Sequence, residues 1–296
     1  MRSWISQNRW LLFGLWLTCS VAISWKAFHA LLQYSLGNDD ASHILLIPLV
    51  SGWLLYLDRQ KIFTSPSADF LVSAILLLPG IALVLGSLDH ASASPSMCAL
   101  GLVLLWISGF ALCFGRAALK AAQFPLLFLL LFIPLPDFFL NKIVYFLQRG
   151  SAEISALLFG LTGLPVLREG FVFRLPRFSI EVARECSGIR SSIALLVLAI
   201  LVGHFFLRKL WKQSVFVLAG IVVMIVKNGI RIVTLTLLAN YVDPGFLFGS
   251  LHRQGGVVFF MIGLLLLVPV FWLLQRNETS TDSSDTPVIT GPAAVL

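Results

Sequence analysis

The sequence has little charge: only 12% of its 296 residues are Asp, Glu, Lys or Arg, against roughly 25% in an ordinary soluble domain. A chain with so few charges cannot cover a water-exposed surface. Its 58% hydrophobic content and mean hydropathy of +0.93 predict a bundle of membrane-spanning helices, because lipid can then replace water around the outside. The net charge is +7, but the basic residues are scattered between apolar runs, so we expect no nucleic-acid partner.

Cysteine is also scarce, with four residues in the chain. They form no CxxC pair and no Cys/His spacing of the kind that binds zinc, and they do not suggest a disulfide framework. The cysteines therefore indicate no zinc site. Cys19, Cys98 and Cys113 lie in or beside apolar runs and are interpreted as packing residues.

Eight apolar segments are long enough, or nearly long enough, to cross a bilayer. They are Trp10–Leu32, His43–Leu57, Phe70–Leu88, Met97–Phe114, Ala121–Leu135, Ser187–Leu207, Ser214–Leu238 and Gly255–Leu274. The first follows a basic N-terminus without a small-residue cleavage site, so we expect it to be retained. The fold class predicted is an all-α polytopic membrane protein with a transmembrane domain over residues 1–276 and a polar, disordered tail over 277–296.

The short loops between these segments differ in charge. One set carries the basic residues Arg59, Lys61, Arg116, Lys120, Arg208, Lys209 and Lys212, whereas the alternate loops GNDDAS and DHASASPS have no Lys or Arg. The positive-inside rule places the basic set in the cytoplasm. Both termini are then cytoplasmic, in a multi-pass protein of the bacterial inner membrane.

One long segment, Pro136–Cys186, falls on the extracytoplasmic side. Its first part, Asp137–Leu161, has helical spacing of apolar residues and is predicted to lie along the membrane surface. Its second part contains two alternating runs, 171–175 and 178–182, joined at Leu-Pro-Arg. This pattern predicts a small β-hairpin on the outer face.

Cys186 directly follows this hairpin, where the sixth span begins. A helix N-terminus favours an anion, so the pKa of a thiol there should fall, and the thiolate is the nucleophilic form of cysteine. The positive charges of Arg184 and Arg190 should also lower the pKa of the thiol, whereas the negative charge of Glu185 should raise it. The alternative is a small buried apolar residue.

The seventh span carries three polar residues, Lys227, Asn228 and Arg231. Counted from Lys212, Arg231 lies roughly 25–30 Å along the helix, near the outer edge of the hydrocarbon. Asn228 and Arg231 are three residues apart and share a face. Arg231 could stabilise an oxyanion, or it could snorkel or form a structural ion pair. Lys227 is one turn deeper and could pair or line a polar crevice.

His252 precedes the eighth span, again on the outer side. Histidine is the usual proton-transfer group near neutral pH, although a single loop histidine often has no special role. Cys186, Arg231 and His252 are nevertheless all predicted to lie at the same level on the outer side of the membrane. This orientation is inferred from the loop charges alone and not from these three residues. The agreement favours an acyl-transfer site, and His43 could line the same cavity.

The blocks CSGIRSS, NGIR and a histidine before the last span resemble the exosortase/archaeosortase family, and DDASHILLIPLVSGWLLYLDRQ is similar to its early segment. The resemblance implies that Cys186 is the nucleophile, His252 the acid/base and Arg231 the stabilising cation. Asn228, His43, Ser187 and Gly188 would support them.

The same resemblance implies a membrane cysteine endopeptidase or transpeptidase. This acyl-transfer chemistry needs neither a metal nor an organic cofactor. Its substrates would be membrane-anchored proteins bearing a motif such as Pro-Glu-Pro, a transmembrane helix and a basic tail, and a glycan or lipid amine could serve as acceptor. The alternatives are a transporter or export accessory protein for an anionic polysaccharide precursor, which should show inverted repeats and broken helices, and a membrane acyl- or glycosyltransferase, which should gather several acidic or histidine residues. Neither sign is evident in the sequence.

Overall fold

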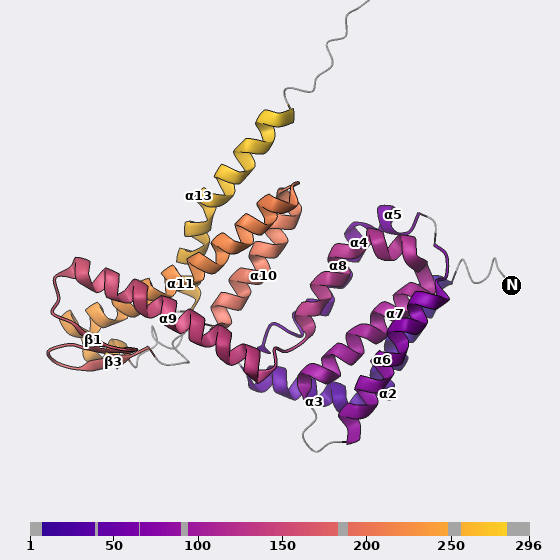
Figure 1. The fold of residues 1–296 in the computed structure, drawn as a ribbon, viewed down its shortest axis with the longest axis horizontal. Coiled ribbons are helices and arrows are strands. Elements are labelled where there is room, and N and C mark those ends of the chain that lie inside the picture. Colours follow the sequence, from indigo (N-terminus) through magenta and orange to yellow (C-terminus); the bar gives the residue numbers. More distant parts are fainter. Residues whose placement is uncertain are drawn as a thin grey trace, which may run out of the picture. The chain divides into compact units, whose positions relative to one another are not determined.

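The computed structural model describes residues 8–38, 41–64, 66–89, 94–182, 189–247 and 256–282. The chain forms two compact units, Met1–Leu140 and Asn141–Leu296, each of which is built mainly of helices (Figure 1). The predicted all-α polytopic class is therefore confirmed.

Within the described ranges, four helical stretches are long and apolar enough to cross a membrane: Phe70–Ser87, Pro95–Ala121, Leu210–Tyr241 and Gly256–Arg276. The number rises to six if each of two bent helix pairs counts as one span. Shorter apolar helices cover Leu46–Leu57 and Ser191–Phe206. The chain is thus a multi-pass membrane protein, and the total of eight spans stays a prediction.

The first unit contains helices α2 (Arg9–Ile23), α3 (Trp25–Gly37), α4 (Leu46–Leu57), α5 (Arg59–Ile62), α6 (Phe70–Asp89), α7 (Pro95–Ala121), α8 (Gln123–Phe128) and the 3₁₀ helix η2 (Leu129–Phe132). Helices α6 and α7 approach closely where glycine removes side-chain bulk. A Cβ on Gly101 would lie 2.9 Å from Val84, and one on Gly80 would lie 3.1 Å from Leu105. Small residues allow this kind of contact between membrane helices.

The predicted first span is not one straight helix. It divides at Ser24 into α2 and α3, whose axes differ by 82°. The Ser24 hydroxyl bonds back to the Ser20 carbonyl, and Trp106 donates to the Ser20 hydroxyl at 3.0 Å. Such i−4 bonds compete with the helical ladder and bend helices, which a hydropathy profile does not register.

The second unit contains most of α9 (Asp137–Thr162), then β1 (Leu167–Glu169), β2 (Val172–Arg174), β3 (Ser179–Glu181), α10 (Ile189–Phe206), α11 (Leu210–Tyr241), η4 (Pro244–Leu247) and α13 (Gly256–Asp282). Helix α13 runs past the predicted start of the tail at residue 277. Residues 283–296 lie outside the described ranges, so the disorder of the tail stays a prediction.

The three strands form an antiparallel sheet in the order β1-β2-β3. Strands β2 and β3 come from the two alternating runs of the sequence, and Phe173 lies opposite Ile180. Strand β1 pairs with β2 on the other side and is an addition to the prediction. Its residues, Leu-Arg-Glu, do not alternate in polarity and so give no strand signal.

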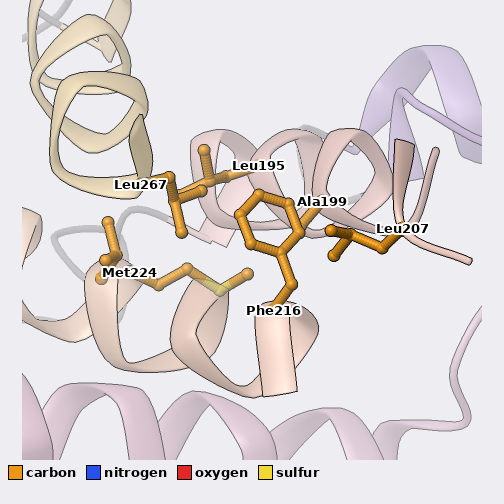
Figure 2. Packing of buried hydrophobic residues seen from close by; sticks show 7 residues of the cluster. Leu195, Ala199, Leu207, Phe216, Met224 and Leu267 are labelled. Carbon is orange, nitrogen blue, oxygen red and sulfur yellow. The ribbon is translucent and has the colours of Figure 1, made fainter. Parts of the chain in front are cut away.

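Helices α10, α11 and α13 share one apolar core. Figure 2 shows the Phe216 ring beside Ala199 and Leu207, with Leu195 and Leu267 facing each other above Met224. All six of these side chains are buried. This core fixes the three helices as one packed group.

The sheet packs on α9 and α11 through a second core. Its buried members are Ala152, Phe159, Phe173, Leu175, Val182 and Val233. The last described residue before α10, Val182, donates its N–H to Phe171 O at 2.9 Å and accepts a hydrogen bond from Gln148. The chain that leads into residues 183–188 is therefore anchored to α9.

Candidate functional site

The sequence proposes seven site residues, and the structure describes three of them. Cys186, Ser187, Gly188 and His252 lie outside the described residues. Asn228 and Arg231 lie on α11 in the second unit. The structure brings these two together on one helix, and the assignments on the other residues stay predictions.

His43 belongs to the first unit, in the turn between α3 and α4, where it is half-buried. The buried Ser35 hydroxyl stabilises this turn by donating to Ala41 O at 2.8 Å. The turn thus has a defined conformation, and the supporting role of His43 stays a prediction.

Asn228 links α11 to α9. Its side-chain amide donates to the Ser151 hydroxyl at 3.0 Å, and both side chains are buried. Gly229 next to it makes the approach possible, because a Cβ there would lie 2.5 Å from Ile154 Cγ2. Asn228 therefore holds the polar face of α11 in a fixed orientation.

Lys227 makes a contact that the sequence did not specify. Its ammonium donates a short hydrogen bond to the Ser191 hydroxyl on α10, and the lysine is only 1% exposed. In the sequence, this contact is indicated only by the two serines of the segment GIRSS at the start of a span. They did not show which serine faces Lys227, because that depends on how α10 is rotated about its axis.

The helices of this group run in alternating directions. Near the start of α11, Lys212 Nζ donates to Leu274 O late in α13 at 2.9 Å. Further along α11, Lys227 contacts Ser191 in the first turn of α10, and a Cβ on Gly263 of α13 would lie 3.3 Å from its stem. Ser191, Lys227 and Gly263 therefore occupy one level.

Arg231 is four residues beyond Lys227, or about 6 Å further along the axis. It is half-buried. Because α10 and α13 run antiparallel to α11, moving from Lys227 toward Arg231 leads toward the first residues of these two helices, Ile189 and Gly256. By the rise per residue, Arg231 lies within about one turn of the level at which both helices begin.

The sheet adds charged residues beside α9. Arg168 binds both carboxylate oxygens of Glu153, at 2.8 and 2.9 Å. These hydrogen bonds raise the pKa of the Arg168 guanidinium above its ordinary value. The pair fastens the sheet to the helix in a fixed, bidentate geometry.

The described ranges contain no group of three or more His, Cys, Asp or Glu residues that could hold a metal ion. The three cysteines within these ranges are free thiols. Cys98 is buried and Cys113 half-buried within α7. In these ranges, the chemistry that the geometry supports is hydrogen bonding and cationic stabilisation around α11.

Comparison with known proteins agrees with this architecture. The family model described as transmembrane exosortase (Exosortase_EpsH) matches residues 10–269, a range that includes the sheet, α11 and, apart from Arg9, both bent helix pairs. No curated protein and no solved structure gives a significant match. Because the family model covers most of the sequence, this multi-pass membrane protein belongs to the transmembrane exosortase family.

Proposed function

We propose that the chain is a cysteine endopeptidase or transpeptidase that cleaves C-terminal sorting signals of exported proteins at the outer face of the inner membrane. The observation that carries the proposal is the family match over residues 10–269. The position of Arg231 supports it, because this cation lies near the level at which α10 and α13 begin. Cys186 and His252 immediately precede those two helices in the sequence.

In the proposed reaction, the Cys186 thiolate attacks the scissile carbonyl and Arg231 stabilises the resulting oxyanion. When the tetrahedral intermediate collapses, the C–N bond breaks and His252 gives a proton to the leaving amine. The acyl group then remains on sulfur as a thioester. Water releases it as a carboxylic acid, or an amine of a glycan or lipid takes it as an amide.

The supporting residues have separate proposed roles. Asn228 orients the α11 face that carries Arg231 through its bond to Ser151. Ser187 and Gly188 follow the nucleophile directly in the sequence, where small residues would leave room for a carbonyl.

The proposed topology has eight spans, cytoplasmic termini and the sheet on the extracytoplasmic side. The sheet packs against Val233 of α11, and Arg177 donates to Asn240 O at 3.4 Å. Both contacts lie on the part of α11 beyond Arg231. The sheet and Arg231 therefore belong to the same end of this helix, as a site on the outer face requires.

The decisive experiment is Cys186→Ala in cells that also produce a membrane-anchored substrate with a Pro-Glu-Pro motif, a transmembrane helix and a basic tail. We expect the variant to insert normally but to leave the substrate uncleaved on an immunoblot, because no thioester can form. Cys113→Ala is the matched control, since this half-buried cysteine lies in α7. Normal cleavage by Cys186→Ala would exclude the covalent mechanism and favour the transport alternative.

A further inference from the structure

The cation of Lys227 is buried at a depth where charge is costly. Its side chain is 1% exposed, within a stretch apolar enough to cross a membrane. A charged side chain inside a membrane is expensive and usually marks a functional position. A methionine would fill a similar volume without this cost, so packing alone does not account for a lysine here.

The surroundings of Lys227 direct its ammonium to one place. Gly263 leaves room for the aliphatic stem, because a Cβ there would lie 3.3 Å from Lys227 Cδ and 3.3 Å from Leu195 Cδ2. Val223 borders the same position. With apolar groups along the stem, the ammonium makes its hydrogen bond to Ser191 on α10.

This bond joins two elements that matter for the proposed reaction. Ser191 is two residues after Ile189, the first described residue of α10, and Lys227 is one turn below Arg231 on α11. The bond therefore ties the first turn of α10 to the polar face of α11. A hydrogen bond from a charged donor in such surroundings is stronger and more directional than one between neutral groups.

We infer that Lys227 and Ser191 form a positioning pair, which fixes the start of α10 against α11 so that the groups of the proposed acyl-transfer site keep their alignment. The inference rests on the proposed function and assigns the pair no contact with substrate. Small displacements of reacting groups cost large factors in rate. Loss of the pair should therefore slow the chemical step more than it weakens substrate binding.

The test compares Lys227→Met and Ser191→Ala with the control Ser192→Ala in proteoliposomes. Ser192 is also buried, and among the described residues its hydroxyl has no hydrogen-bond partner. The control therefore removes a hydroxyl from the same helical turn without breaking a bond. The readouts are the single-turnover cleavage rate, the substrate density at half-saturation and the melting temperature.

We expect Lys227→Met and Ser191→Ala each to lower the cleavage rate about 10- to 100-fold, because a displacement of about 1 Å in a reacting group can cost a factor of this order. Half-saturation should change less than about twofold. The double variant should be about as slow as the worse single variant, because both changes remove the bond that the two residues share. Lys227→Arg, which keeps a donor and a charge, should recover part of the rate.

A further variant displaces the Lys227 side chain without replacing this residue. Gly263→Val would put methyl groups against the Lys227 stem and against Leu195 Cδ2, so we expect a loss of rate in the same direction as in Lys227→Met. Gly203→Ala on α10 is its control, because a Cβ there would have only ordinary contacts, the nearest at 3.7 Å.

The outcomes separate the two proposals. If Cys186→Ala abolishes cleavage while Lys227→Met and Ser191→Ala cleave at the wild-type rate, the positioning pair is wrong and the proposed function stands. If Cys186→Ala cleaves normally, the proposed function fails and the pair fails with it. A loss of rate that only follows the loss of folded protein, or an equal loss in Ser192→Ala, would also overturn the pair. Should Lys227→Met not fold, Ser191→Ala decides, since it removes only one oxygen.

Discussion

At the scale of single residues, Gly115 has the conformation that allows α7 to break. Its φ of 80° lies in the left-handed region, and a Cβ there would lie 1.9 Å from Ser67 O. Around the break, carbonyl groups of α7 find partners outside the helix: Ser67 N–H bonds to Phe114 O at 3.2 Å, and Arg9 bonds to Cys113 O at 2.8 Å. The loop before α6 and Arg9 of α2 therefore satisfy carbonyl groups that the broken ladder leaves open.

Gly115→Ala should destabilise the protein strongly. A non-glycine residue in this backbone region costs about 1–3 kcal/mol, and the contact with a backbone oxygen cannot be relieved by a rotamer change. We expect a clearly lower melting temperature in detergent. Gly86→Ala on α6 is the control, because nothing lies within 4 Å of its would-be Cβ. Equal melting temperatures for the two variants would contradict the described break.

Residue chemistry could be predicted from the sequence where polarity conflicts with its surroundings. Asn228 and Arg231 are recognisable because they interrupt an apolar run, and their shared face follows from helical spacing. Ser151, the partner of Asn228, and Ser191, the partner of Lys227, could not be predicted, since each belongs to another helix. Which side chains meet depends on how far each helix is rotated and shifted, and apolar segments of similar hydropathy leave both open.

At the scale of elements, the crossing of α9 and α11 depends on small residues. A Cβ on Gly150 of α9 would lie 2.9 Å from Ile225, and one on Gly229 of α11 would lie 2.5 Å from Ile154. The crossing carries the bond between Asn228 and Ser151. Close backbone approach of this kind lets dispersion contacts and interhelical hydrogen bonds form together.

Gly229→Ala should push the two helices apart. The added methyl overlaps Ile154, and overpacking costs about 1–3 kcal/mol, which exceeds the gain of up to ~1 kcal/mol in helix propensity. We expect a lower melting temperature and slower substrate cleavage. Combining it with Ile154→Ala should restore part of both, because that change removes the nearest atom, Cγ2, while Cβ stays at 2.9 Å.

Gly160→Ala on α9 is the control for this pair, since its would-be Cβ has nothing within 4 Å. Unchanged stability in Gly229→Ala, or no recovery in the double variant, would mean that the crossing is looser than described.

Element boundaries were predictable where hydropathy changes abruptly and unpredictable where hydrogen bonds decide. The apolar run Phe70–Leu88 appears almost unchanged as α6. The run Trp10–Leu32, by contrast, bends at Ser24 without a proline or glycine. Its cause is a set of side-chain bonds that includes Trp106, from a helix far along the chain. The sequence around Ser24 therefore does not indicate this partner.

At the scale of the whole molecule, the charge of the short loops predicts which side of the membrane each end of a helix faces. Lys61 lies in α5, within the basic set, and its side chain is 83% exposed. Glu169 lies in the sheet, where its half-exposed carboxylate pairs with Arg174 at 2.7 Å. An exposed ion pair of this kind contributes at most about 1 kcal/mol to the stability of the fold. Replacing Lys61 or Glu169 should therefore have little effect on folding.

In a variant without native cysteines, Lys61→Cys and Glu169→Cys should therefore respond differently to a membrane-impermeant maleimide. The positive-inside rule places Lys61 in the cytoplasm and the sheet outside. We expect label on Glu169→Cys in intact spheroplasts and label on Lys61→Cys only after the membrane is permeabilised. Label on Lys61→Cys alone in intact spheroplasts would show that the orientation is the reverse of the predicted one. Label on both variants would show that the two positions do not lie on opposite sides of the membrane. The sheet and the outer end of α11 could then no longer form a site for exported substrates.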